Sequence, residues 1–279
     1  MIKIATIITL YHPQETIFRN IKKLLPLVSN IYLVINSPLK EKFTQKLLSI
    51  PKVTILHNKG NNLGIAKALN KGLEQAKKDH ISWLLTMDQD SYFEKEDLTL
   101  LLQEFKQLPK EELLIFSPIH NNKFLQKNTQ TNIQEIDFIM TSGNIVNVDL
   151  AYKIGKYNEE LFIDEVDHDF CFRAKIHNYK IFQCTSIALQ HTLGVPHSKY
   201  ASINIYPPIR LYYMIRNYLY IRKRYKKKDT LFFKKRDFYL IKFFLKQLIF
   251  GSKRKEKVFM IVQGIYSFYT KQFGAYPYA

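Results

Sequence analysis

The first 90 residues alternate short apolar runs with segments of helical periodicity, and this order restricts the fold more than any other feature. Apolar, β-branched runs cover residues 2–10, 31–35 and 53–56, and none of them has helical spacing. Amphipathic segments at 14–25 and 43–48 separate these runs. Because consecutive parallel strands are joined by a crossover that is usually a helix, the order predicts a parallel sheet in an α/β fold.

A fourth apolar run, residues 81–85, leads into a hexapeptide from Thr86 to Ser91 that contains Asp88 and Asp90. Two carboxylates after a strand would lie at the carboxyl edge of the sheet, where open α/β folds bind ligands. A divalent cation such as Mg²⁺ takes one or two protein carboxylates and completes its shell with phosphate oxygens and water. The hexapeptide therefore predicts a site for a metal and a nucleotide diphosphate, although a polar turn fits it equally well.

A loop rich in glycine and asparagine, residues 58–64, opens a helix that contains the small residues Gly64, Ala66 and Ala68. Small residues and backbone N–H groups at a helix N-terminus allow an anionic ligand to approach closely. The spacing matches neither the dinucleotide-binding glycine motif nor a P-loop. A plain helix N-terminus is therefore the alternative to a phosphate site.

A second concentration of acids lies within residues 161–173, where Asp164, Glu165, Asp167 and Asp169 stand among large apolar residues. At the start of a helix such a cluster is stabilised by the helix dipole and can be purely structural. Acids in an apolar setting are nevertheless more often paired, bound to a ligand or catalytic.

Two further positions belong to apolar runs in the middle of the chain. Residues 138–147 fit a strand with Ser142 and Gly143 inside it, and a glycine there suggests close approach to a ligand or another backbone. His191 ends a later apolar run, just before Gly194. A lone histidine in that place is more often a packing residue than a ligand, unless the acidic turn needs a third ligand.

Charge divides the chain into two regions. The net charge is +18, and residues 199–279 carry 19 Lys and Arg against three acids. A segment of this kind has an anionic partner, either nucleic acid or a membrane surface. The hydrophobic content of 46% argues against intrinsic disorder. Cys171 and Cys184 are the two cysteines, no signal peptide precedes the first strand, and no apolar run spans a bilayer, so we expect a reduced, cytoplasmic protein.

The basic tail fits a set of helices that begins near the proline pair at 207–208. Within 231–250, Lys235, Lys242 and Lys246 fall on one helical face, and Phe, Leu and Ile fill most of the remainder. A narrow cationic stripe beside a broad apolar face suits a membrane interface. The alternatives are a helical layer packed on the rest of the protein and a nucleic-acid surface, for which no fold signature is present.

The order of these motifs resembles family 2 glycosyltransferases of the GT-A fold, and within them the bacterial rhamnosyltransferase-like branch. The motifs that carry the resemblance are, in chain order, Thr9 to Pro13, Asn36-Ser37, Asn62 to Gly72, Asp88 to Ser91, Thr141 to Gly143, Phe162 to Arg173 and His191 to Gly194. The resemblance implies a Rossmann-like, mostly parallel sheet flanked by helices over residues 1–205. This catalytic domain would have a nucleotide-sugar half over about 1–92 and an acceptor half over about 93–205. Residues 206–279 would form a basic, aromatic-rich helical extension at the membrane interface.

The resemblance also implies roles for single residues. Asp90 would bind Mg²⁺ or Mn²⁺, with His191 completing the metal site, and Asp167 matches the general base, with Asp169 as second choice. The nucleotide would be held by Thr9, Tyr11, Asn36, Asn62, Gly64, Lys67 and Asp88. The acceptor side would include Ser142, Gly143, Asp164, Asp169 and Arg173. The family commonly has an acid where this chain has Ile35, which leaves the nucleobase open between uridine and thymidine.

The expected function is inverting transfer of a sugar, foremost rhamnose from dTDP-rhamnose, to a hydroxyl of a polyprenyl diphosphate-linked glycan in bacterial surface polysaccharide synthesis. The protein would work at the inner face of the cytoplasmic membrane and would bind its anionic surface. The alternatives are a galactofuranosyl-, galactosyl- or glucosyltransferase that uses a UDP-sugar, a nucleotidyltransferase, and a non-catalytic binding protein on the same scaffold. We expect no nucleic-acid partner, and a homo-oligomer stays open.

Overall fold

The computed structural model describes residues 3–58, 60–94, 96–121, 133–190, 195–196 and 204–277. The chain divides into two compact units. The first unit combines Met1–Asn158 with Asp167–Thr192, and the second combines Glu159–Val166 with Leu193–Ala279. The short segment Glu159–Val166 therefore belongs with the C-terminal helices, although both of its sequence neighbours belong to the first unit.

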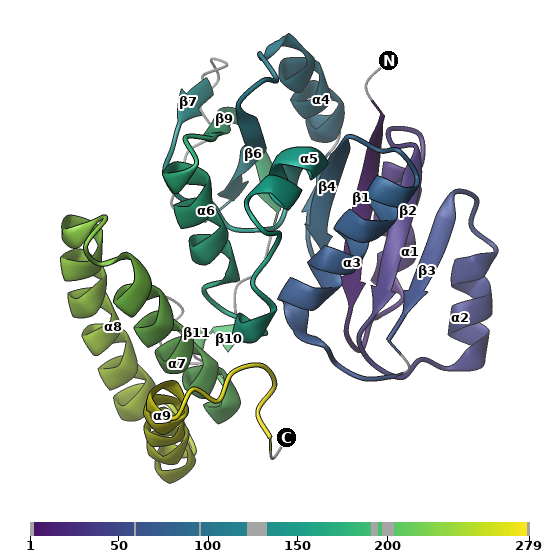
Figure 1. Ribbon diagram of the computed structural model, residues 1–279. Coiled ribbons are helices and arrows are strands. Elements are labelled where there is room, and N and C mark those ends of the chain that lie inside the picture. The colour runs from purple at the N-terminus through teal and green to yellow at the C-terminus, as the bar shows by residue number, and fades with distance from the viewer. Residues whose placement is uncertain are drawn as a thin grey trace. The chain divides into compact units, whose positions relative to one another are not determined.

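The first unit is built on a nine-stranded sheet in the order β3-β2-β1-β4-β8-β6-β9-β5, with β7 beside β9 (Figure 1). Its strands are β1 (Ile4–Leu10), β2 (Asn30–Ile35), β3 (Val53–His57), β4 (Trp83–Asp88), β5 (Tyr92–Phe93), β6 (Leu113–Asn121), β7 (Ile133–Glu135), β8 (Asn144–Asn147) and β9 (Lys180–Gln190). The strands β3, β2, β1 and β4 are parallel. Antiparallel pairing begins at β8, between β4 and β6.

The helices of the first unit follow the predicted alternation. They are α1 (Thr16–Leu24), α2 (Glu41–Leu48), α3 (Gly64–Lys78), α4 (Asp97–Gln107), α5 (Val148–Lys153) and α6 (Val166–Ile176). The first three connect consecutive parallel strands, as short crossovers between such strands require. The α/β fold that the sequence predicted is confirmed.

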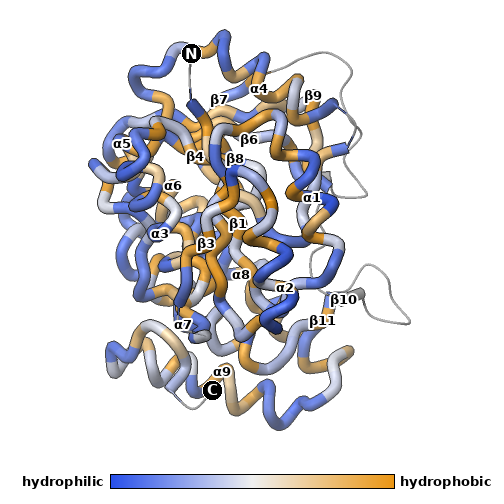
Figure 2. Tube along the Cα trace, turned by 90° about the vertical axis from the view of Figure 1, so that its right-hand side faces the viewer, coloured by the Kyte–Doolittle hydropathy of each residue, from blue (hydrophilic) through white to orange (hydrophobic). Residues whose placement is uncertain are grey.

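The two faces of the parallel strands bury different side chains, because neighbouring residues of a strand point to opposite faces. On one face, Ile8 packs in the apolar core that also contains Ile17 and Ile21 of α1. The opposite face is covered by α3, where a Cβ on Gly72 would collide with Ile7. Figure 2 shows the hydrophobic course of β1, β3 and β4 through this unit.

Two details of the sheet differ from the prediction. The strand β4 continues through Asp88, which pairs with Thr9 of β1, so the turn begins only at Gln89. Residues Ser142 and Gly143 precede β8 instead of lying inside a strand over 138–147. In both cases pairing with a neighbouring strand, which local sequence does not specify, decides where the strand begins or ends.

Among its described residues, the second unit contains the short 3-10 helix Glu159–Leu161, two paired antiparallel strands, β10 (Val195–Pro196) and β11 (Asn204–Ile205), and three α-helices. The helices are α7 (Pro208–Tyr225), α8 (Thr230–Phe250) and α9 (Arg254–Tyr269). Pro208 occupies the first turn of α7, as predicted, and Asp229 caps α8 by accepting a hydrogen bond from the Phe232 amide. Gly264 lets α9 approach α7 closely, because a Cβ there would lie 2.6 Å from the Tyr212 carbonyl oxygen. Among the described residues, no helix combines the length and apolar composition that crossing a membrane requires.

Candidate active site

Three of the predicted nucleotide-binding residues share one face at the carboxyl edge of the parallel strands. Thr9 is paired with Asp88 on the neighbouring strand, and Asn36 directly follows β2. By the alternation of strand side chains, all three project to the face that α3 covers. Thr9 Oγ1 is buried, and in the part of the chain that the structure describes it has no hydrogen-bond partner. The edge therefore presents an amide, a hydroxyl and a carboxylate side by side.

The turn after β4 is held by side chains to which the sequence assigned no role. Gln89 accepts a hydrogen bond from the Tyr11 amide through Oε1 and donates one to the Tyr11 carbonyl through Nε2, both at 2.9 Å. Asn20 of α1 donates to the carbonyl oxygens of Gln89 and Ser91, at 3.3 and 3.4 Å. The turn that carries Asp90 is thus fastened to β1 and to α1. A buried asparagine on the apolar face of α1, between Ile17 and Ile21, was the signal available in the sequence.

The loop that opens α3 is ordered by a chain of asparagines. Asn58 donates to Asn36 Oδ1, and Asn36 donates to the Gly64 carbonyl at 3.1 Å. Asn62 accepts from the Gly64 amide at 3.0 Å, and Gly64 has φ +78°, a conformation that favours glycine. Lys67 lies exposed in the first turn of α3. The predicted residues Asn62, Gly64 and Lys67 therefore belong to one loop and helix start, to which Asn36 is hydrogen-bonded from the end of β2.

Ser142 and Gly143 lie beside the end of β4. The Asp88 amide donates to Ser142 Oγ at 3.0 Å, and the Gly143 amide donates to the Thr86 carbonyl at 2.6 Å. Gly143 has φ +82°, and a Cβ there would lie 3.0 Å from Leu189. The close approach expected at this glycine is thus made to protein groups, and its acceptor role stays a prediction.

Two carboxylates lie at this edge, those of the half-buried Asp88 and the exposed Asp90. Within the described residues, no group of three or more His, Cys, Asp and Glu could hold a metal. His191, the predicted further ligand, lies outside the described residues. Two carboxylates fit an ion such as Mg²⁺ that takes its other ligands from phosphate oxygens and water.

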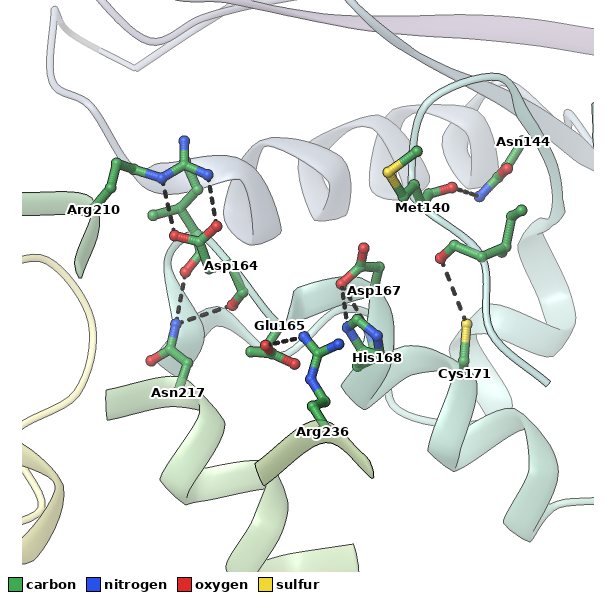
Figure 3. Close-up of polar contacts among 12 residues, drawn as sticks. Met140, Asn144, Asp164, Glu165, Asp167, His168, Cys171, Arg210, Asn217 and Arg236 are labelled. Carbon is green, nitrogen blue, oxygen red and sulfur yellow. Dashed lines mark hydrogen bonds and ion pairs between the residues drawn. The ribbon is translucent and has the colours of Figure 1, made fainter. Parts of the chain in front are cut away.

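The acids around α6 lie in different environments. The Asp167 side chain is 23% exposed, and its Oδ1 accepts the His168 amide at 2.8 Å with His168 Nδ1 at 3.2 Å (Figure 3). The Asp169 side chain is 1% exposed and accepts from Arg173 Nε at 2.9 Å. Arg173 also donates to the Ile154 carbonyl at 2.6 Å. Asp167 is thus more accessible than Asp169, which the resemblance gave as the second choice for the base.

Cys171, on the same helix, is buried. Burial raises the pKa of its thiol to about 12, and the thiol donates a long hydrogen bond of 3.9 Å to the Ile139 carbonyl. A raised pKa favours the protonated thiol over the reactive thiolate, which disfavours Cys171 as a nucleophile.

The two remaining acids form ion pairs within the second unit. Asp164 accepts both arms of the Arg210 guanidinium, at 3.0 and 2.6 Å, and Glu165 pairs with Arg236 at 2.5 Å (Figure 3). Both acids have left-handed backbone conformations, with φ of 65° and 61°. Such a conformation costs an L-residue with a side chain roughly 1–2 kcal/mol. Asp164 was predicted on the acceptor side, and that role stays a prediction.

Comparison with known proteins identifies the family to which this chain is similar and the fold that it shares. The family described as Glycosyl transferase family 2 matches residues 6–184. The chain is 28% identical over 247 residues to the dTDP-rhamnosyl transferase RfbF of Shigella flexneri, an alignment that covers 80% of this chain and 81% of that protein.

Two solved structures resemble the fold. One is GalNAc-T7, crystallised with UDP, GalNAc and Mn²⁺, with a TM-score of 0.57 and 13% identity over 69% of this chain and 43% of that chain. The other is residues 1–349 of S. aureus TarS, with a TM-score of 0.53 and 13% identity over 97% of this chain and 73% of that chain. These similarities confirm the GT-A fold. The family match extends over more than half of this chain. The chain therefore belongs to glycosyl transferase family 2.

Proposed function

We propose that this glycosyltransferase transfers rhamnose from dTDP-rhamnose, with inversion, to a hydroxyl of a lipid-linked glycan. The observation that carries the proposal is the meeting of Thr9, Asn36 and Asp88 on one face of the strand edge, beside the ordered start of α3. The choice of donor rests on the similarity to a relative named as a dTDP-rhamnosyl transferase.

Donor binding is assigned to this edge. Asp88 contacts the nucleotide and Asp90 binds Mg²⁺ or Mn²⁺, with His191 as a further ligand. An ion held there would supply positive charge to the departing diphosphate. Backbone N–H groups at the start of α3 and the exposed Lys67 offer positive potential to the diphosphate. The remaining nucleotide contacts are assigned to Tyr11, Asn62 and Gly64.

The transfer step needs a base on the acceptor side. As the acceptor oxygen bonds to the anomeric carbon, the bond between that carbon and the diphosphate oxygen breaks, and the acceptor hydroxyl loses its proton. Asp167 is assigned to take this proton, because its carboxylate is partly accessible and its orientation is held by His168. Ser142, Gly143, Asp164, Asp169 and Arg173 are assigned to the acceptor side, through direct contact or support.

Membrane association is proposed for the helical extension, residues 206–279. Five large apolar residues of α8 are between 52% and 63% exposed: Leu231, Phe238, Ile241, Leu245 and Ile249. They recur at helical spacing and so form one stripe along α8, which we name the α8 stripe. Among the described residues, twelve of the sixteen exposed large hydrophobic side chains lie on α8 and α9.

An anionic bilayer suits this surface, because residues 206–279 have 18 basic residues against three acids. Aliphatic and aromatic side chains would enter the lipid interface while Lys242 and Lys246 reach the head groups. The enzyme would then bind its lipid-linked acceptor at the membrane that carries this lipid, at the inner face of the cytoplasmic membrane.

The test is a panel of dTDP-rhamnose, UDP-galactofuranose, UDP-galactose and UDP-glucose, screened for thermal stabilisation and for metal-dependent release of nucleoside diphosphate. We expect dTDP-rhamnose to give the strongest response. A UDP-sugar in first place would replace the donor and keep the reaction class. Release of pyrophosphate would indicate a nucleotidyltransferase, and binding without turnover in the presence of membrane acceptor would indicate a binding protein.

The base is tested separately with Asp167→Asn. We expect this variant to bind dTDP with Mg²⁺ as the wild type does and to lose transfer by at least a hundredfold. Turnover at the wild-type rate would remove Asp167 from the mechanism.

A further inference from the structure

The segment that immediately precedes Asp167 has an unusual backbone. Phe162, Asp164 and Glu165 have φ of 62°, 65° and 61°, in the left-handed region that residues with side chains rarely adopt. Conformations of this kind persist only where the surroundings over-determine them, and they cluster at functional sites. Contacts around this turn must therefore hold it in the left-handed conformation.

The carbonyl groups of the turn are held by one buried side chain of α7. Asn217, with no exposed surface, donates to the carbonyl oxygens of Leu161, Ile163 and Asp164 at 2.7, 2.6 and 3.0 Å. Figure 3 shows Asn217 beside Asp164. Three carbonyl oxygens of the turn thus converge on a single amide group.

Arg216, the preceding residue, holds Asn217 in turn. It is also fully buried, and its Nε donates to Asn217 Oδ1 at 2.9 Å. Its remaining nitrogens donate to the carbonyl oxygens of Leu161 at 3.2 Å and of Gly274 at 2.8 Å, among others. The Arg216 guanidinium therefore sets the orientation of the Asn217 amide. Gly274, near the C-terminus, helps to hold the guanidinium by accepting one of its hydrogen bonds.

Ion pairs hold the side chains of the same turn. Arg210 donates to both carboxylate oxygens of Asp164, and Arg236 pairs with Glu165. The side chains of Asp164 and Glu165 are 14% and 6% exposed. A buried polar arrangement of this kind contributes little net stability compared with apolar packing, and its best-attested use is to specify one conformation. The second unit thus specifies the conformation of residues 161–165.

We propose that Arg210, Arg216 and Asn217 are positioning residues for the catalytic base, acting by holding the left-handed turn that leads the chain into Asp167. Val166 alone separates Glu165 from Asp167, and α6 begins at Val166. A change in the turn therefore changes the direction in which the first residues of α6 leave it. This inference rests on the proposed role of Asp167 and extends it to α7.

The test uses the full chain and a matched pair of substitutions. Arg210→Gln removes the ion pair that holds the turn, whereas Arg222→Gln removes the similarly exposed pair between α7 and Asp237 of α8. We expect Arg210→Gln to lower kcat for metal-dependent transfer about fivefold to tenfold and Arg222→Gln to leave it unchanged. Binding of dTDP with Mg²⁺, measured by titration calorimetry, stays within twofold of wild type in both. Equal rates for the two variants would overturn the proposal.

A double-mutant cycle gives the second readout. Asn217→Ala lowers kcat about tenfold to a hundredfold, as a misplaced catalytic group does. In the Asp167→Asn background we expect the same change to have less than a twofold effect, since no base remains to be positioned. Losses that multiply would show a general structural role and refute the positioning role. Should Asn217→Ala fail to fold, the Arg210 and Arg222 pair decides the question.

The outcomes also separate this inference from the function it rests on. Wild-type turnover of Asp167→Asn alone would overturn the assignment of the base. Loss of turnover in Asp167→Asn together with multiplying losses would leave the base in place and overturn only the role of Asn217.

Discussion

The side-chain amide of Gln89 forms a closed pair of hydrogen bonds with the backbone of Tyr11, accepting from its N–H and donating to its C=O at 2.9 Å. The pair joins two residues that are 78 positions apart in the chain. It imitates the bonding between paired strands just beyond the place where β1 and β4 end. The turn that carries Asp90 thereby keeps a fixed relation to the predicted nucleotide pocket.

Substitution of Gln89 by alanine should weaken donor binding. Two hydrogen bonds that contribute about 0.5–1.5 kcal/mol each would be lost, partly compensated by water because the pair is exposed. We expect the Kd for dTDP with Mg²⁺ to rise about tenfold, measured by calorimetry. The control is Gln45→Ala, which removes an exposed glutamine whose side chain donates to Glu41 on α2. A Gln89→Ala variant with wild-type affinity would show that the pair does not order the site.

Substitution of Asp90 by alanine should abolish the metal dependence of donor binding. Removing one of two available carboxylates leaves a hard cation with too few protein ligands at this edge. We expect dTDP to bind this variant equally with Mg²⁺ and with excess EDTA, whereas the wild type binds more tightly with Mg²⁺. The exposed Glu111, replaced by alanine, serves as the control for loss of one negative charge. Metal-dependent binding that survives in Asp90→Ala would exclude this residue as a ligand.

Breaking the ion pair of Asp169 should destabilise the protein without removing the base. Asp169→Asn leaves Arg173 without its carboxylate, and breaking a buried pair costs about 3–5 kcal/mol. The exposed pair of Lys253 and Glu256 gives the comparison, because Glu256→Gln should cost no more than about 1 kcal/mol.

Urea unfolding monitored by circular dichroism measures both changes. The transfer rate per folded Asp169→Asn molecule should stay within tenfold of wild type, in contrast to Asp167→Asn. A hundredfold loss in fully folded Asp169→Asn would instead make Asp169 the better candidate for the base.

Polar substitutions in the α8 stripe should weaken membrane binding. Phe238→Ser, Ile241→Ser and Leu245→Ser, combined, remove apolar surface that would be buried in the lipid interface. Co-sedimentation with vesicles containing anionic lipid should show at least tenfold weaker binding, while wild-type binding falls as salt is raised.

The matched control for the α8 stripe is the combination of Leu48→Ser and Leu100→Ser, two exposed leucines of the first unit. We expect this control to bind the vesicles as the wild type does. Equal weakening by both combinations would exclude the α8 stripe as the membrane surface. The same conclusion would follow if neither the wild type nor the variants bound the vesicles.

The sequence identified the parallel half of the sheet because its signals are local. β-branched runs and helical spacing act over five to fifteen residues, and the observed β1, α1, β2, α2, β3, α3 and β4 follow them closely. The ordered motifs likewise indicated the family, and the carboxyl edge of β4 as its site. The pairing between Asp88 and Thr9 was not predictable from either segment alone, and it moved the start of the turn to Gln89.

For the four acids of residues 161–173, the residue pattern determined only that they lie in an apolar setting, and the family resemblance named Asp167 as the base with Asp169 as second choice. The tertiary structure decided that Asp164 and Glu165 pair with Arg210 and Arg236, that Asp169 is buried against Arg173, and that Asp167 stays partly accessible.

By itself, therefore, the sequence determined the α/β fold, the glycosyltransferase family and the basic character of the helical tail. Each of these depends on residue types and on short spacings along the chain. Only the tertiary structure decided how residues far apart cooperate, as Gln89 does with Tyr11 and Asn217 with the turn before Asp167. The physical reason is that hydrogen bonds and burial depend on distances in space, and chain segments more than 50 residues apart set those distances only when the whole unit packs.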